Sequence, residues 1–104
     1  MILEIALLNV KPGQAEAFEG AFAQAQAIIA AMPGYCSHRL QRCLESPGKY
    51  ALLVEWRALE DHTIGFRQSP GYQEWRALLH HFYHPFPVVE HYERVATGDG
   101  MTGD

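Results

Sequence analysis

The sequence predicts a single α+β domain of the ferredoxin-like kind, with the element order β-α-β-β-α-β and a four-stranded antiparallel sheet. Three observations lead to this prediction. The chain has 104 residues, which is enough for one domain of modest size. Its 48% hydrophobic and 19% charged residues are typical of a globular protein. Apolar runs of strand length alternate with segments of helical periodicity, and Pro or Gly marks most boundaries between them.

The first strand and the first helix follow from the N-terminal third of the chain. Residues 2–10 are apolar on both faces except for Glu4 and Asn9, which indicates a strand covered on both sides. A Lys-Pro-Gly turn follows, and Pro33-Gly34 ends the helix that comes after it. Between these signals, apolar residues recur at helical steps of four and three: Phe18, Phe22, Ala25, Ile29 and Met32.

Two further strands come next, joined by a short loop. Residues 35–44 alternate apolar and polar side chains less regularly and are predicted to form the second strand. Residues 45–49, Glu-Ser-Pro-Gly-Lys, are strong turn formers of hairpin length. Residues 50–56 are predicted to form the third strand. One face of it carries Tyr50, Leu52, Val54 and Trp56.

The second helix is predicted in two pieces. Residues 59–67 and 72–83 have helical periodicity and are separated by the Ser69-Pro70-Gly71 break. Residues 84–87, His-Pro-Phe-Pro, stop the second piece, and residues 88–95 complete the sheet. The domain is therefore expected to span residues 1–95, with residues 96–104 as a polar tail.

Charge and hydropathy exclude several classes of partner. The formal net charge of −4, with basic residues scattered along the chain, argues against nucleic acid. No segment reaches the ~18 consecutive apolar residues that cross a bilayer, and the N-terminus lacks the features of a signal peptide. We therefore expect a cytoplasmic protein. Cys36 and Cys43 are expected to be free thiols, because on one strand they would lie roughly 23 Å apart and face opposite sides.

His62 is the strongest candidate for chemistry. With Leu59 as the reference position on a helix, His62 and Phe66 fall on the same side, so the imidazole should face the sheet. An imidazole can accept or donate a proton near neutral pH, so activity should rise with pH through its titration. The same position also fits a core histidine hydrogen-bonded to a backbone carbonyl.

An aromatic group surrounds this histidine in the predicted fold. The inward stripe of residues 72–83 consists of Tyr72, Trp75, Leu79 and Phe82. Such stripes more often form a core than a binding site, but the Tyr and Trp side chains carry polar atoms that need partners. A flat cavity for a planar aromatic substrate is predicted, walled by Trp56, Phe66, Tyr72 and Trp75.

The histidines near residue 80 invite a metal hypothesis. His80 and His84 are spaced for one helical face, and His91 on the last strand is a further potential ligand. However, His81 points away, no carboxylate joins the group, and histidines at a helix C-terminus are favoured by its dipole alone. We therefore expect no metal site. No fingerprint for flavin, nicotinamide or phosphate binding is present, so no cofactor is expected.

The segment from Glu55 to Tyr72 has a distinctive order of features. A strand ends in Glu55-Trp56-Arg57, a helix with the inward His62 follows, and Ser69-Pro70-Gly71 precedes Tyr72. In this order the segment resembles the antibiotic biosynthesis monooxygenase family of small dimeric α+β barrels, and the resemblance extends over roughly residues 1–95. It implies a cofactor-free monooxygenase that acts on phenols, quinols or polyketide-type rings. His62 would be the base, with Tyr72 or Trp75 orienting the ring.

The oligomeric state follows partly from the fold itself. All helices of this fold cover one sheet face, and the chain has no further element for the other face. Leaving a large apolar sheet in water would be unusual for a monomer. A second copy of the chain is the simplest cover, so we expect a homodimer.

Two alternatives to an oxygenase remain. Haem-degrading enzymes share the fold, but the places of their Asn, Trp and His hold Ala6, Gly65 and Arg76, and Asn9 is displaced. This argues against haem breakdown and leaves haem binding through another histidine open. The other alternative is a non-catalytic, small-ligand-binding or accessory dimeric domain, because no second acid–base group evidently faces the predicted cavity.

Overall fold

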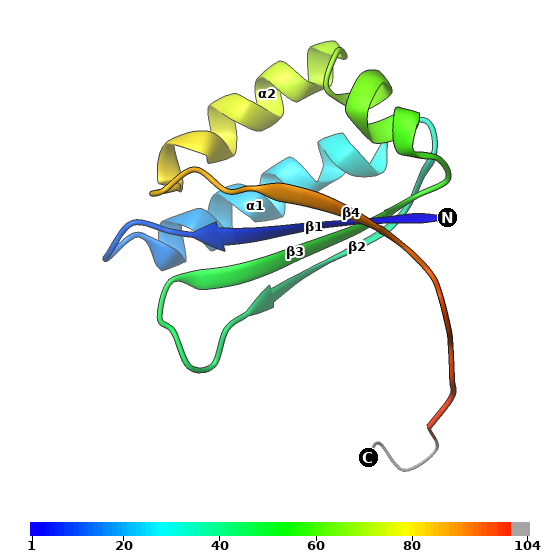
Figure 1. Ribbon diagram of the computed structural model, residues 1–104. Helices are drawn as coiled ribbons and strands as arrows, with labels where there is room; N and C mark the ends of the chain where they lie inside the picture. Colours follow the sequence, from blue (N-terminus) through cyan, green and yellow to red (C-terminus); the bar gives the residue numbers. More distant parts are fainter. Residues whose placement is uncertain (101–104) are drawn as a thin grey trace.

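A computed structural model describes residues 1–100 as a four-stranded antiparallel sheet with helices on one face (Figure 1). The strand order is β2-β3-β1-β4. The elements are β1 (Ile2–Asn9), α1 (Ala15–Ala30), β2 (Tyr35–Arg42), β3 (Lys49–Trp56), the π-helical turn η1 (Asp61–Phe66), α2 (Pro70–Leu79), the 3₁₀ turn η2 (His80–Phe82) and β4 (Val89–Glu93). The ferredoxin-like class and the split second helix are confirmed.

The central strand β1 fixes which residues face the helices. It pairs with β3 along its whole length, from Ile2 opposite Trp56 to Asn9 opposite Lys49, and with β4 on its other side. Side chains alternate between the two faces of a strand, so Glu4, Ala6 and Leu8 all point toward the helices and are buried. The register also places Glu4 directly beside His91 of β4.

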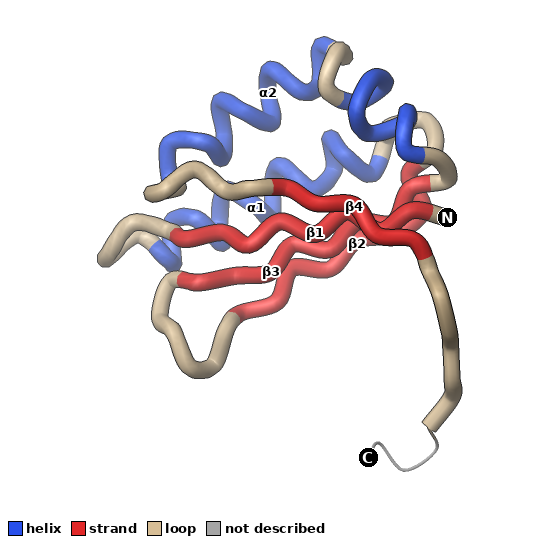
Figure 2. The backbone as a smooth tube through the Cα atoms, viewed as in Figure 1, coloured by secondary structure: helices blue, strands red, loops and turns tan. Residues whose placement is uncertain are grey.

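The core lies between the sheet and the two long helices (Figure 2). Four residues of the predicted stripe are buried in α1, whereas the fifth, Met32, follows the end of the helix and is partly buried against the core. Phe18 is at its centre, with its ring in contact with those of Tyr50, Phe82 and Tyr83. The helices approach closely at Gly71, where an added Cβ would lie 3.1 Å from side-chain atoms of Ile28 and Met32.

The segment that carries His62 differs from the expected α-helix. It is a π-helical turn of six residues that begins at Asp61, and Arg67 N–H donates to the carbonyl of His62. His62 and Phe66 are buried as predicted, but Leu59 precedes the turn and is 40% exposed. Leu59 is therefore not part of the inward stripe. Single π turns of this kind are rare and often occur at functional sites.

Gly34 positions the turn η1, and the Ser69-Pro70-Gly71 break positions the helix α2. Gly34 has φ +84° and packs so closely against the Asp61 side chain that a Cβ could not fit without a shift. The Ser69-Pro70-Gly71 break is shorter than expected, because Pro70 already begins α2. Ser69 is the N-cap, and its hydroxyl accepts a hydrogen bond from Tyr72 N–H at 3.2 Å.

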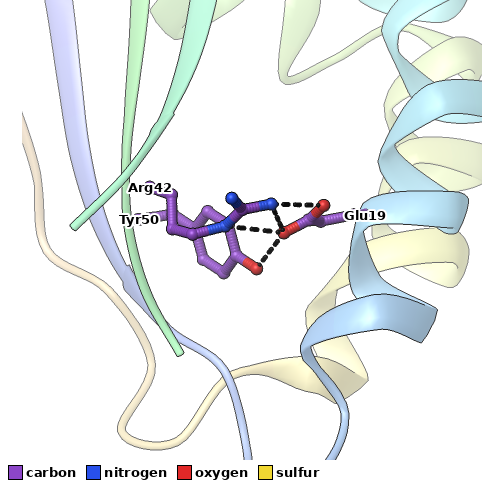
Figure 3. A network of polar contacts seen from close by, with 3 residues as sticks. All are labelled: Glu19, Arg42 and Tyr50. Carbon is purple, nitrogen blue, oxygen red and sulfur yellow. Dashed lines mark hydrogen bonds and ion pairs between the residues drawn. The ribbon is translucent and has the colours of Figure 1, made fainter. Parts of the chain in front are cut away.

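A polar network ties α1 to the β2–β3 hairpin (Figure 3). Glu19 of α1 accepts hydrogen bonds from the Arg42 guanidinium, the shortest at 2.7 Å, and from the Tyr50 hydroxyl. These bonds, first that from Tyr50 and then that from Arg42, lower the pKa of Glu19. The network is exposed to solvent, so its contribution to stability is modest.

Within residues 1–100, no helix covers the opposite face of the sheet (Figure 2). Leu52 and Val54 face the helices, so the open face of β3 presents their neighbours Ala51 and Leu53. Leu7 of β1 lies on the same open face and is 49% exposed.

Other sequence expectations fall at the edges of this fold. Cys36 and Cys43 are free thiols, the first exposed and the second half-buried. Within residues 1–100, no helix combines the length and apolar character needed to cross a membrane. The last four residues of the expected polar tail, 101–104, lie outside the described residues.

Candidate functional site

A cavity of about 360 Å³ lies between the sheet and the helical segments η1, α2 and η2. This volume suits a small molecule of one or a few rings. The lining residues are Glu4, Ala6, Leu8, Leu52, His62, Phe66, Arg67, Tyr72, Trp75, His80, Tyr83, Phe86, Pro87 and Val89. Carbon-rich side chains dominate this set, and a few polar groups are placed among them.

Most of the predicted site residues meet at this cavity. His62, Phe66, Tyr72 and Trp75 all line it. The ring of Phe66 contacts Tyr72 and Trp75 edge to face, with centroids 5.2 and 5.5 Å apart. Aromatic rings in this arrangement stabilise one another and keep the wall rigid.

Trp56 differs from the prediction that it walls the cavity. It is fully buried and is not among the lining residues. Its indole stacks on the His62 ring, with centroids 5.4 Å apart and planes 19° from parallel. Its Nε1–H donates a hydrogen bond of 2.9 Å to Oε1 of Glu4. Trp56 therefore contacts the two polar residues Glu4 and His62 from the side away from the cavity.

Glu4 is the polar residue that the sequence did not assign to the site. It is 5% exposed and lines the cavity. Burial raises the pKa of its carboxyl group, and the hydrogen bond from Trp56 and the charge of Arg67 offset this only in part. A carboxyl group of raised pKa in an apolar pocket is suited to accept and release a proton.

His62 lies between Glu4 and His91. It is 3% exposed, with Nε2 3.4 Å from Oε1 of Glu4 and Nδ1 2.8 Å from Nε2 of His91. Burial, followed by the charges of Arg67 and His91, lowers its pKa to about 3. His62 is therefore neutral at physiological pH, and the titration that was expected near neutral pH lies in the acid range.

The pKa shifts of Glu4 and His62 reinforce each other. An ionised Glu4 would favour the imidazolium form of His62, whereas a protonated Glu4 does not. His91 lies on the solvent side of the row, and burial also lowers its pKa. Burial thus shifts the pKa of each of the three groups in the direction that disfavours its charged form.

The far wall of the cavity contains His80. The sequence suggested this residue only as a potential metal ligand. Its ring packs against Phe86 and Tyr72, with centroids 4.9 and 5.9 Å away. Burial and then the nearby Arg76 lower its pKa. His81 and His84 are exposed and are not among the lining residues. Within residues 1–100, no three His, Cys, Asp or Glu side chains are grouped to hold a metal ion.

Arg67 gives the cavity its positive charge. It follows η1, is exposed, and is the one Lys or Arg among the lining residues that the structure describes.

The three positions that correspond to the Asn, Trp and His of haem-degrading enzymes do not come together at the cavity. Ala6 lines the cavity, but Gly65 and Arg76 are exposed on helical segments.

Some of these residues left a signal in the sequence. Glu4 is a charged residue in an apolar strand at a position that alternation turns inward, and this signal was visible. His80 lies eight positions after Tyr72, close to two whole turns of an α-helix. His91 needed the register of β4 against β1, which the sequence does not specify.

Comparison with known proteins identifies the family. The family model for the antibiotic biosynthesis monooxygenases matches residues 1–78, so the chain belongs to this family. It is 57% identical over 95 residues to the uncharacterized protein YczJ of Bacillus subtilis. The aligned residues make up 91% of this chain and 100% of that protein. The structural resemblance confirms the fold at the same time.

Two solved structures illustrate that resemblance. A Bordetella bronchiseptica protein that carries the family's name is 37% identical, with a TM-score of 0.87, over 91% of this chain and 97% of its own. SnoaB, a cofactor-independent oxygenase from Streptomyces nogalater, has a TM-score of 0.70 at 21% identity, over 94% of each chain. At that identity the likeness to SnoaB shows a shared fold.

The shifted titration of His62 predicts a specific pH dependence of stability. The pKa of His62 is about 3 in the folded chain, against 6.5 without the fold, so the unfolded chain takes up the proton first as the pH falls. Stability that is present above pH 6.5 is therefore lost progressively below it. His62→Phe should reduce this loss by up to about 2 kcal/mol between pH 6.5 and pH 5, because each pH unit in this window is worth about 1.4 kcal/mol.

Denaturant unfolding at a series of pH values measures this effect. The exposed His81 provides the control, since His81→Phe should keep the pH dependence of the wild type. If His62→Phe and the wild type lose stability in parallel, His62 is not held neutral by burial.

Proposed function

We propose that this protein is a cofactor-independent monooxygenase that oxidises a small aromatic substrate, such as a phenol, a quinol or a polyketide-like ring. The observation that carries the proposal is a buried acid–base pair, Glu4 and His62, at the polar end of an aromatic cavity. Membership of the monooxygenase family supports it. The shared fold with SnoaB, a cofactor-independent oxygenase, supports a reaction without an added cofactor.

The chemistry needs an electron-rich substrate. Removal of a hydroxyl proton gives a phenolate-type anion, which passes one electron to O₂. The resulting radical pair combines to give a peroxide on a ring carbon. That carbon then loses its hydrogen as a proton while the O–O bond breaks. One oxygen atom stays on the product as the carbonyl, and the other leaves as water with this proton and the proton first taken from the hydroxyl group. The walls of the cavity exclude bulk water and so protect these intermediates.

Each part of the site has a role in this proposal. The His62–Glu4 pair takes the hydroxyl proton, with His62 in the acid–base position that the sequence motif suggests. Tyr72 and Trp75 hold the flat face of the ring. Arg67 attracts the negative charge that develops on the substrate oxygen.

The second candidate is a non-catalytic domain that binds a small aromatic ligand. It is favoured by one observation, because both ring nitrogens of His62 already face other side chains. A ligand that binds in the cavity without being oxidised would support this candidate.

We also propose that two copies of the chain pack through their open sheet faces and form a homodimeric barrel. Leu7 and Tyr92 are 49% and 47% exposed on this face, and Leu53 lies between β1 and β2 on the same side. A second sheet would remove this apolar surface from water, which is the usual reason for such an association.

Oxygen uptake tests the proposed reaction. Wild-type protein without added flavin, haem or metal should consume O₂ with some members of a panel of quinols and anthrone-type phenols. His62→Ala should lower turnover by about 10²–10⁴-fold, because it interrupts proton transfer. The exposed histidine variant His81→Ala should retain activity. An unchanged rate in His62→Ala would remove His62 from the reaction, and a panel without any O₂ consumption would favour the binding domain.

Sedimentation velocity tests the proposed dimer. Leu7→Asp places a charge in the middle of the open face and should convert a dimer into a monomer of 11.7 kDa. Leu44→Asp changes a leucine that is 92% exposed in the β2–β3 loop and should leave the dimer intact. Far-UV circular dichroism confirms that both variants are folded. A wild-type monomer at micromolar concentration would contradict the proposal.

A further inference from the structure

Both ring nitrogens of His62 lie next to other titratable side chains. Its Nδ1 lies 2.8 Å from Nε2 of His91, and its Nε2 lies 3.4 Å from Oε1 of Glu4. One face of its ring is covered by Trp56. The carboxyl group of Glu4 also lines the cavity, so it offers a path for a proton between a ligand and His62.

Glu4 has one oxygen available for this purpose. Oε1 takes both the hydrogen bond from the Trp56 indole and the contact with His62. Among residues 1–100, no fully buried side-chain oxygen lacks a hydrogen bond, and no group of these residues donates to Oε2. Oε2 is therefore open to the cavity and within reach of a ligand hydroxyl.

We propose that Glu4 is the catalytic residue that accepts the ligand's proton, and that His62 and His91 carry a proton from Glu4 to the surface. The β1–β4 register supports the path, because it sets Glu4 and His91 side by side on the helix-facing side of the sheet. His91 is half-buried on β4 and is not a cavity residue, so it forms the outer end of the row. The proposal rests on the proposed function for the nature of the ligand, and on geometry alone for the path.

The transfer balances proton by proton. Protonated Glu4 gives the proton on Oε1 to Nε2 of His62, while His62 gives its Nδ1 proton to Nε2 of His91. His91 releases a proton from Nδ1 to water. The ligand O–H bond then breaks, and its proton binds Oε2 of the resulting Glu4 carboxylate. Each imidazole gains one proton and loses one, so both change tautomer and neither remains a cation.

The surrounding charges favour this form of transfer. Glu4 faces Trp56 of β3, His62 of η1, His91 of β4 and the Arg67 guanidinium. Burial disfavours the ionised carboxylate, and burial followed by Arg67 disfavours imidazolium at both histidines.

The longest step in the row is the contact between Glu4 and His62. Its 3.4 Å exceeds an ordinary hydrogen bond, so transfer requires the two side chains to approach each other. Acid–base contacts of this kind commonly tighten when a ligand binds.

NMR titration of the wild-type protein tests the path without any turnover. The side-chain carboxyl carbon of Glu4 and the ring nitrogens of His62 and His91 are followed against pH. The proposal predicts one common midpoint, at which Glu4 gains its proton and both imidazoles change tautomer without becoming imidazolium. Glu4→Gln should abolish the tautomer change, and His81→Phe should preserve it. A Glu4 titration that leaves both tautomers fixed would overturn the proposal.

Turnover measurements separate this proposal from the proposed function. If a substrate is oxidised, Glu4→Gln should lower its turnover by about 10²–10⁴-fold, and His91→Phe should slow it while binding is retained. Full activity in Glu4→Gln would overturn the role of Glu4 and leave the oxygenase intact. A coupled tautomer change in a protein that oxidises nothing would support the path and contradict the proposed function.

Discussion

The hydrogen bond from the Trp56 indole to the buried carboxyl group of Glu4 is the interaction on which the site depends. A carboxyl group in an apolar interior is costly unless it has a partner, and Trp56 provides that partner from the neighbouring strand. The same indole is the surface on which the His62 ring stacks. One side chain that does not reach the cavity therefore sets the position of both acid–base groups that the proposed function uses.

The fold supplies the remaining constraints on this arrangement. Antiparallel pairing of β1 with β3 and β4 brings Trp56, Glu4 and His91 to the helix-facing side of the sheet. The π-helical turn then presents His62 and Phe66 to that sheet over a short segment. Helix α2 completes the enclosure, and its Tyr72 and Trp75 make the cavity aromatic. Polar chemistry is thus confined to one end of an otherwise apolar space.

The sequence predicted the fold better than the site, and the reasons are physical. Periodicity and turn residues mark elements reliably, so the strands and the stripe of α1 were placed within a few residues. Helical phase also predicted that His62 and Phe66 point inward. The helical phase of a residue does not show, however, which residues of other elements lie opposite its side chain. The Glu4–His62–His91 row depends on strand register, and the burial of Trp56 behind His62 depends on the path after β3. Tertiary contacts of this kind have no local sequence pattern.

A double-mutant cycle on unfolding measures the central interaction most directly. Trp56→Phe removes the indole donor and is made both in the wild type and in a Glu4→Leu background, where no carboxyl group needs it. The packing that Trp56→Phe removes is lost in both backgrounds, so it cancels when the two free-energy costs are subtracted. Trp56→Phe should cost about 1–3 kcal/mol more when Glu4 is present, because it leaves a buried carboxyl oxygen without its donor. An equal cost in the two backgrounds would contradict this expectation.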